Sequence, residues 1–424
     1  RTRADKTLRR SSSVTVEAQP AEPEKKTAKR SSPGESLSSP GKLLLNAVLG
    51  LFFVAWLQVF GVFISLPLLY VAVLLYPFHY GKYDVSCRME VRSVIIIYFT
   101  VLSVPVLLFW VVRRGGVQAI VLLSAYVAWY TFMDDAPKRG GRFLRTLRQR
   151  AFWKHFAAYF PMKLTREEEL DPEKNYVFGY HPHGIISLGA LCNFGTEATG
   201  FAQLFPGIDL RLLTLTMNFR IPFFREYLLG MGINDVSRES CERNLSRGPG
   251  SSIMIVVGGA RESIETAQGG RDSLILSNRK GFVKLALRKG ASLVPVYSFG
   301  ENDVFGVFRS SWLTELQIRM QKKLGFAVPL FFGRALTAGL LHRLFGLNVG
   351  VLPLRVPIHS VVGKPIHLKK TPNPSQEEVD EAHARYMEEL KRIHSEWKDK
   401  FEKEREDVLK QCDAERAKIY RSGR

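Results

Sequence analysis

The chain has 424 residues and a formal net charge of +20, with 60 Lys and Arg residues against 40 Asp and Glu residues. This length allows one large domain with additional segments, or two ordinary domains. A positive charge of this size indicates nucleic acid, an anionic membrane surface or a phosphate-rich ligand. Basic residues cluster in the N-terminal tail, beside apolar segments and near the C-terminus, and they do not alternate with exposed aromatic residues as in a nucleic-acid-binding surface. We therefore expect membrane contact and no nucleic-acid partner.

The cysteines form no CxxC pair and no even framework; they are Cys87, Cys192, Cys241 and Cys412. This usage fits a reducing, cytosol-facing location and argues against a structural zinc site.

Apolar runs predict membrane-embedded chain within residues 43–133, after a disordered basic tail over 1–42. The runs cover 43–76, 94–112 and 117–133. One crossing needs about 20 apolar residues, so the first run predicts a crossing with an interfacial piece, or a bent re-entrant hairpin. The second and third runs predict a membrane hairpin with a short turn.

Basic residues flank the apolar runs on both sides. They precede residue 43, and they follow the last run as Lys138, Arg139, Arg142, Arg145, Arg148 and Arg150. Cytosolic flanks are enriched in Lys and Arg, so we expect both flanks in the cytosol and an even number of crossings. Arg113 and Arg114, in the turn between the second and third runs, argue against a fully translocated loop.

Residues 134–163 predict a basic amphipathic segment that lies in the membrane interface. Its aromatic and aliphatic residues, interspersed with Arg and Lys, are Phe143, Leu147, Phe152, Phe156 and Phe160. The alternative is an ordinary surface helix of the domain that follows.

Residues 164–370 predict an α/β domain with a mixed, largely parallel sheet and flanking helices, because strand patterns alternate with helical ones. The predicted strands are 175–180, 210–215, 252–257, 292–298 and 358–362. The predicted helices are 187–200, 222–231, 239–246 and 279–289. Residues 371–424 predict a charged amphipathic helix, with an apolar stripe formed by Val379, Tyr386, Leu390, Ile393, Trp397 and Phe401.

The sequence His181-Pro182-His183-Gly184 follows directly on the first predicted strand of this domain. Proline ends strand pairing and glycine frees the backbone, so both imidazoles are expected on a loop at the strand end. Histidine titrates near neutral pH and can accept and return a proton. Catalysis, metal binding and a structural role all remain open for the two histidines at this point.

Glu262 follows the strand predicted at 252–257. If that strand lies beside the strand at 175–180, Glu262 approaches His183 and can fix its tautomer and stabilise the imidazolium. The alternative is a surface carboxylate that caps the following helix.

Two basic clusters are candidates for phosphate binding: Asn218 with Arg220, and Arg279 with Lys280 at the start of a helix. The alternatives are ion pairs with local acids such as Glu226, and simple helix packing. The sequence contains no GxSxG, GxxxxGK[ST], GxGxxG or HExxH motif, which disfavours a serine hydrolase, an NTPase, a Rossmann dehydrogenase and a metalloprotease.

Ten short motifs, in order from about Arg92 to Met387, resemble the diacylglycerol O-acyltransferase type 2 family, which also contains monoacylglycerol and wax-alcohol acyltransferases. The motifs are Tyr159-Phe160-Pro161, Tyr180-His181-Pro182-His183-Gly184, Asn193 with Thr196-Glu197-Ala198-Thr199, Phe205-Pro206-Gly207-Ile208, Asn218-Phe219-Arg220-x-Pro222, Arg225-Glu226-Tyr227, Val256-Val257-Gly258-Gly259-Ala260-x-Glu262-Ser263, Arg279-Lys280-Gly281-Phe282, Ser298-Phe299-Gly300-Glu301-Asn302 and Val361-Val362-Gly363-x-Pro365-Ile366.

The resemblance implies a glycerolipid-acyltransferase-like enzyme of the endoplasmic reticulum and lipid droplet, with its catalytic domain and both termini in the cytosol. It implies transfer of a fatty acyl group from acyl-CoA to diacylglycerol in the bilayer, with no metal and no cofactor; a homo-oligomer stays open. In this interpretation His183 is the general base, His181 orients or donates to the oxyanion, and Glu262 supports the base. Pro182 and Gly184 shape the oxyanion loop.

Under the same resemblance, CoA phosphates are expected to bind Asn218, Arg220, Arg279 and Lys280. Monoacylglycerol, a long-chain alcohol or a lysophospholipid are alternative acceptors, and a non-catalytic lipid-binding scaffold is an alternative of another class. Residues 43–76, an apparent insertion at 333–352 and the long C-terminal helix depart from the family pattern.

Overall fold

The computed structural model describes residues 85–265, 274–307, 315, 317–319, 331–333 and 352–422. The predicted tail 1–42, the apolar run 43–76 and most of the predicted insertion 333–352 lie outside the described residues.

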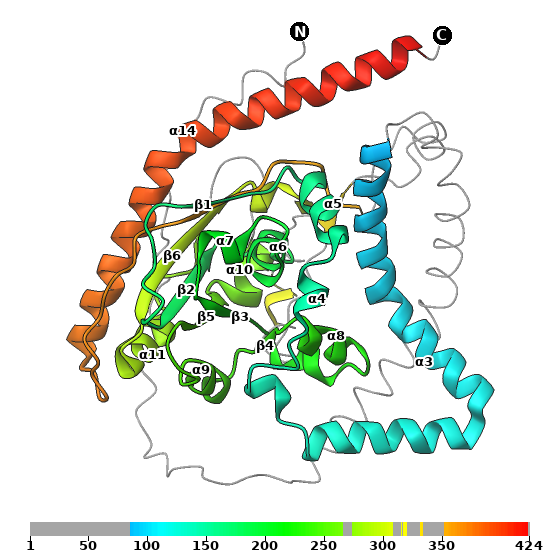
Figure 1. The fold of residues 1–424 in the computed structure, drawn as a ribbon, viewed down its shortest axis with the longest axis horizontal. Helices are drawn as coiled ribbons and strands as arrows, with labels where there is room; N and C mark the ends of the chain where they lie inside the picture. Colours follow the sequence, from blue (N-terminus) through cyan, green and yellow to red (C-terminus); the bar gives the residue numbers. More distant parts are fainter. Residues whose placement is uncertain are drawn as a thin grey trace.

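A seven-stranded sheet forms the centre of the described part of the chain (Figure 1). Its strands, in spatial order, are β1 (Lys163–Arg166), β9 (His359–Val362), β6 (Ser292–Phe299), β2 (Tyr176–His181), β5 (Ser251–Val256), β3 (Asp209–Thr214) and β4 (Asn234–Asp235). Neighbouring strands are parallel except for the antiparallel pair β6 and β9. The predicted α/β class with a largely parallel sheet is confirmed, as are the five predicted strands. β1 and β4 escaped prediction because the first is short and polar and the second has two residues.

β2 lies in the middle of the sheet, and every residue in it is buried. Side chains alternate along a strand, so Tyr176, Phe178 and Tyr180 enter one apolar core while Val177 enters another on the opposite face. The first core includes residues of α6 (Leu188–Gly195), and the second includes residues of α11 (Gly281–Lys289) and α14 (Gln376–Ser422). Helices therefore cover both faces of the sheet, as a buried parallel sheet requires.

Further helices complete the two layers: α4 (Arg145–Arg148), α5 (Ala151–Tyr159), α7 (Phe201–Leu204), α8 (Phe224–Gly230), α9 (Arg238–Asn244) and α10 (Gly259–Glu265). The predicted helices correspond to α6, α8, α9 and α11. The prediction of helix up to residue 200 was too long, because α6 ends at Gly195 and the chain turns extended at Thr196.

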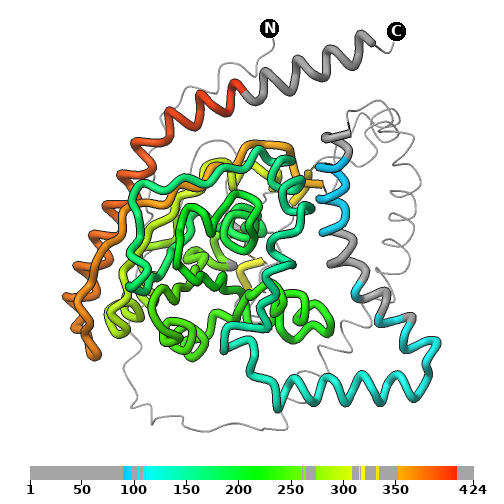
Figure 2. Tube along the Cα trace, in the orientation of Figure 1, coloured from blue at the N-terminus to red at the C-terminus, as the bar shows by residue number. Residues whose placement is uncertain are grey.

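The predicted runs 94–112 and 117–133 belong to one helix, α3 (Val85–Phe132), which is sharply kinked at Gly116. Gly116 has φ +54°, a conformation open to glycine, and the two arms diverge from it (Figures 1 and 2). The first arm packs against α5 and buries Val91 and Val94 in the first core. The two predicted runs of the membrane hairpin are thus an angled pair of arms that meet at Gly116.

The predicted interfacial segment 134–163 is partly integrated into the domain. Phe156 and Phe160 are buried in the first core, so their side chains are not available to lipid. For α5 the structure corrects the interfacial interpretation in favour of the alternative, an ordinary helix of the domain. Phe143 and Leu144, which precede α4, are exposed.

The predicted C-terminal helix is α14, which runs along the sheet beside β6 (Figure 1). The predicted stripe faces the second core: Val379, Tyr386, Leu390, Ile393 and Phe401 are buried, and Trp397 packs against them partly buried. The core of the domain thus extends past the predicted boundary at residue 370.

Candidate active site

Four segments with polar side chains meet at one edge of the sheet, because β2, β3, β5 and β6 are parallel and end there. His183 follows β2, Glu262 lies beyond β5 in α10, and Glu301 follows β6. Asn218 and Arg220 lie in η4 (Thr216–Arg220), beyond β3. The pairing of β2 with β5 confirms the condition under which Glu262 was expected to reach His183.

His183 is partly exposed, and its ring is held from one side. Nδ1 lies 3.1 Å from the carbonyl oxygen of Gly184 and 3.5 Å from the hydroxyl of Ser187. A carbonyl only accepts, so Nδ1 carries the proton and donates it, and Nε2 bears the lone pair. Burial lowers the pKa of His183, which keeps the imidazole neutral near pH 7. This tautomer and charge state are those of a general base that acts through Nε2.

Glu262 is buried and reaches His183 through the backbone. Its Oε1 accepts a hydrogen bond of 2.5 Å from the backbone N–H of His183, and its Oε2 accepts one of 3.0 Å from Ile275 N–H. The approach to His183 was predicted, but the contact differs: the carbonyl of Gly184, rather than Glu262, receives the Nδ1 proton. Glu262 therefore fixes the position of the loop, and no local sequence signal indicates this choice of partner.

His181 faces away from the loop that carries His183. It is the last residue of β2, so its side chain points to the same face as Val177 and is fully buried. Nε2 lies 2.9 Å from the hydroxyl of Tyr386 in α14. Burial, with His383 nearby, lowers the pKa of His181 to about 3. His181 was predicted to orient or donate to the oxyanion; the partner that the structure gives its Nε2 is Tyr386 of α14.

The Tyr386 hydroxyl connects α14 to β2 at two points. It donates to the carbonyl of Gly179 over 3.1 Å, so the proton between it and His181 belongs to His181 Nε2. The space at Gly179 is filled by this hydroxyl, which would lie 2.0 Å from a Cβ atom there. Pro182 ends strand pairing directly after His181, as predicted.

Glu301 is a buried carboxylate that sequence reasoning quoted in a motif but did not place in the site. Its Oε2 accepts hydrogen bonds from the Tyr180 hydroxyl (2.8 Å) and from Gly189 N–H at the start of α6 (2.9 Å). Burial raises the pKa of Glu301 to about 7. Gly184 has φ +60°, and a Cβ there would lie 2.8 Å from Glu301 Cγ, so this loop requires glycine. The sequence signal that could have identified Glu301 is its position directly after Gly300, at the end of a buried strand.

The predicted phosphate ligands are dispersed. Arg220 and Arg279 are exposed, while Asn218 Nδ2 donates to the Thr214 hydroxyl over 2.9 Å. Lys280 Nζ forms an ion pair of 2.6 Å with Asp380 of α14. β5 lies between β2 and β3, so β3 is roughly 10 Å from β2. The turn η4 and the loop that carries His183 therefore lie at the same end of the sheet but do not follow neighbouring strands.

A groove of about 470 Å³ lies between α5 and β1 and includes Lys154, Lys163 and Thr199 in its wall. None of the predicted site residues lines it, so it does not contribute to the chemistry around His183.

The chain is similar to proteins that are named as diacylglycerol or 2-acylglycerol acyltransferases. The family model described as diacylglycerol acyltransferase matches residues 116–411. Diacylglycerol O-acyltransferase 2A of Umbelopsis ramanniana is 45% identical, over 73% of this chain and 83% of that protein. Diacylglycerol O-acyltransferase 2 of Danio rerio is 46% identical, over 68% of this chain and 79% of that protein. 2-Acylglycerol O-acyltransferase 1 of Bos taurus is 44% identical, over 66% and 82%.

Proposed function

The chain belongs to the diacylglycerol acyltransferase family, and we propose that it transfers a fatty acyl group from acyl-CoA to the free hydroxyl of diacylglycerol. The products are triacylglycerol and CoA. The observation that carries the mechanism is the state of His183: a neutral imidazole whose Nδ1 proton is committed to the carbonyl of Gly184 and whose Nε2 carries a lone pair.

In this mechanism Nε2 of His183 removes the proton of the acceptor hydroxyl as its oxygen attacks the thioester carbonyl. The tetrahedral intermediate then expels CoA as the C–S bond breaks, and the imidazolium returns the proton to the sulfur. Glu262 holds the backbone of His183 in place, and Gly184, where a Cβ would contact Glu301, is proposed to give the loop the room to approach the thioester. Gly189 N–H already binds Glu301 and is not offered to the oxyanion.

Acyl-CoA is proposed to arrive from the aqueous side, with exposed Arg220 and Arg279 as candidates for its phosphates. Lys280 is a weaker candidate than its sequence position suggested, since Asp380 already neutralises it. We further propose that the enzyme belongs to the endoplasmic reticulum membrane and lipid droplet, with its catalytic domain and both termini in the cytosol.

Monoacylglycerol is the second candidate acceptor, because the diacylglycerol and 2-acylglycerol acyltransferases among the relatives are nearly equally identical to this chain. The deciding assay supplies membranes containing the protein with labelled oleoyl-CoA and, side by side, diacylglycerol, monoacylglycerol, fatty alcohol and lysophosphatidate. Triacylglycerol as the main product supports the proposal, whereas a main product formed from another acceptor would identify that acceptor as the substrate.

His183→Ala tests the mechanism in the same assay, with His155→Ala, a histidine of α5 outside the site, as its matched control. We expect activity to be lost only in His183→Ala at equal expression. Equal activity in both variants would remove His183 from the mechanism, and absence of product from any acceptor in the folded wild type would favour a lipid-binding scaffold.

A further inference from the structure

Three arginines that are distant in sequence meet near the ring of Phe143, and we name them the arginine group: Arg148 in α4, Arg211 in β3 and Arg247 after α9. The guanidinium carbon of Arg148 lies 5.4 Å from the centre of the Phe143 ring, and that of Arg211 lies 4.7 Å from it. Two positive charges are therefore stacked on one aromatic ring, and the third is joined to them through a shared carboxylate.

That carboxylate, Asp209, is the one acid that forms an ion pair with the arginine group within the described part of the chain. Its Oδ1 lies 2.5 Å from Arg211 Nη1, and its Oδ2 lies 2.7 Å from Arg247 Nη1. Arg148 instead donates from Nη2 to a backbone carbonyl, that of Phe194, while Glu197 and Asp209 act on its charge without an ion pair. Three guanidiniums thus face one carboxylate in contact and one at a distance, which leaves an excess of one to two positive charges.

Burial makes this excess unfavourable. Arg148 and Arg211 are 5% and 6% exposed, and the Nε atom of each is buried without an acceptor among the described residues. Burial lowers the pKa of Arg148, and it lowers the pKa of Arg211 to about 10 although Asp209 opposes the shift. Buried charges are normally paired, because an unpaired charge loses its hydration without compensation. An anion bound beside these side chains would supply the missing partner.

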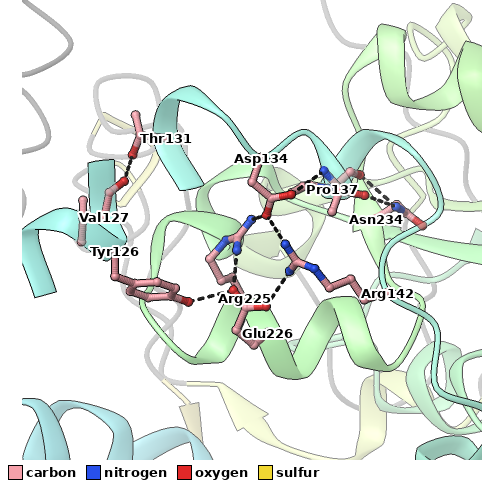
Figure 3. Close-up of polar contacts among 10 residues, drawn as sticks. Tyr126, Val127, Thr131, Asp134, Pro137, Arg142, Arg225, Glu226 and Asn234 are labelled. Atoms are coloured by element: carbon pink, nitrogen blue, oxygen red, sulfur yellow. Dashed lines mark hydrogen bonds and ion pairs between the residues drawn. The ribbon is translucent and has the colours of Figure 1, made fainter. Parts of the chain in front are cut away.

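A neighbouring cluster shows how this chain pairs buried arginines elsewhere (Figure 3). Arg142 forms ion pairs with Asp134 (2.7 Å) and Glu226 (2.6 Å), and Arg225 pairs with the same two carboxylates. Burial alone would lower the pKa of Arg225, but its two acidic partners raise it, the reverse of the direction in the arginine group. Two guanidiniums face two carboxylates in this cluster, so its charge is balanced within the chain and needs no ligand.

Gly140 leaves room beside two members of the arginine group. It is buried and has φ +92°, and a Cβ atom there would lie 3.5 Å from Arg247 Nη1 and 3.8 Å from Arg211 Nε. Both separations are ordinary van der Waals distances, so an atom the size of a methyl group fits at this point. The Nε atom of Arg211 that lacks an acceptor therefore adjoins space that the side chain of another residue type would fill.

We propose that the arginine group binds the phosphate group of a phosphate monoester beside Gly140. Such a group carries about 1.5–2 negative charges at pH 7, which matches the excess positive charge. Guanidiniums bind phosphate through pairs of N–H groups, and within the described structure Arg148 and Arg211 each have only one nitrogen with an acceptor. The remaining nitrogens of both side chains provide the donors.

This site is separate from the loop that carries His183. Arg211 pairs with Ile253 of β5, which pairs with Val177, four residues before His181 at the end of β2. Four residues of strand span about 13 Å, and β5 lies between β2 and β3. A phosphate held by the arginine group does not touch the reacting atoms, so the proposal does not depend on the proposed acyl transfer.

The test measures the Tm of the full-length, detergent-solubilised protein in inorganic phosphate against chloride at equal ionic strength. A ligand that binds the folded state raises Tm with its concentration, and the dependence gives an apparent affinity. Two monoesters distinguish the sources of the phosphate group: soluble sn-glycerol 3-phosphate, and phosphatidate in phosphatidylcholine–detergent micelles, with phosphatidylcholine alone as the blank. A shift with the soluble ester supports a free ligand, and a shift with phosphatidate alone supports a lipid headgroup.

Three variants assign the binding to the arginine group. Arg247→Met removes one guanidinium whose side chain is already 24% exposed, and we expect affinity for phosphate to fall about tenfold or more. Asp209→Asn removes the carboxylate that competes with the anion, and we expect binding about fivefold tighter. Arg238→Met removes an equal charge from an exposed position of α9 and should leave the affinity unchanged.

Asp209→Asn keeps the test decisive, because a loss of stability cannot tighten binding. Equal phosphate-dependent shifts in the wild type and all three variants would mean a general salt effect and overturn the proposal. Absence of a shift in the wild type with inorganic phosphate and with both monoesters would also overturn it, and would leave the arginine group as a purely structural contact between α4 and β3.

Discussion

Removing the hydroxyl of Tyr386 isolates the contact between α14 and the strand that carries the catalytic loop. In Tyr386→Phe the buried His181 Nε2–H loses its acceptor and the Gly179 carbonyl loses one donor. A buried unsatisfied N–H costs about 1–3 kcal/mol and a lost hydrogen bond about 1 kcal/mol, so we expect about 2–4 kcal/mol of destabilisation. For a domain of this size that corresponds to a fall in Tm of roughly 4–16 °C.

The assay is thermal unfolding of detergent-solubilised protein, with Tyr227→Phe as the matched control. Tyr227 is a partly buried tyrosine of α8 whose hydroxyl has no hydrogen-bond partner among the described residues, so its loss should change stability by less than about 0.5 kcal/mol. Equal Tm values for the two variants would refute the assignment of His181 and Tyr386 as a structural pair.

The same pair predicts how His181 differs from His183 in activity. A glutamine places an amide N–H close to where histidine carries Nε2, so His181→Gln can still donate to Tyr386 and should keep most of the wild-type kcat. His183→Gln has no basic nitrogen and should lose activity by a factor of about 10² or more. Comparable losses of kcat in both variants would indicate that His181 also takes part in the reaction.

Three further predictions concern titration and loop position. Because the base must be neutral and burial lowers the pKa of His183, kcat/KM should fall only as pH drops below 6.5; a half-maximum above 6.5 in the pH profile contradicts this. The raised pKa of Glu301, about 7, means that the folded state holds its proton while the unfolded state loses it, so stability should fall by about 3 kcal/mol between pH 4.5 and 7, a slope that Glu301→Gln should abolish in denaturant titrations. Glu262→Gln turns an NH₂ group toward a backbone N–H and should cost about 1–3 kcal/mol and lower kcat; an unchanged Tm would show that both N–H groups have other acceptors.

The sheet and the catalytic loop could be predicted because their sequence signals are local. Buried strands such as β2 and β6 are continuous apolar runs, and Pro182 marks the end of β2 unambiguously. Parallel strands have their C-terminal ends at the same edge of a sheet, and this rule correctly predicted that Glu262 lies near His183.

The roles within the loop could not be predicted because they depend on partners distant in sequence. His181 takes its partner from a helix 205 residues later, and the ring of His183 takes its partner from the adjacent carbonyl instead of a carboxylate. Strand alternation alone would have separated the two histidines, since His181 follows Val177 and Gly179 to the second face of the sheet. The bend of α3 could not be predicted either, because apolar composition does not show that the helix continues through Gly116 with a sharp kink.

The dependence of β2 on α14 also orders the events of biosynthesis. Tyr386 leaves the ribosome about 200 residues after His183, a delay of roughly 10–40 s at ordinary elongation rates. During that interval α3 and the residues of the first core are already synthesised, while the face of the sheet that carries His181 still lacks α14. The first core can therefore begin to assemble before the second, and α14 is the helix that completes the surroundings of β2.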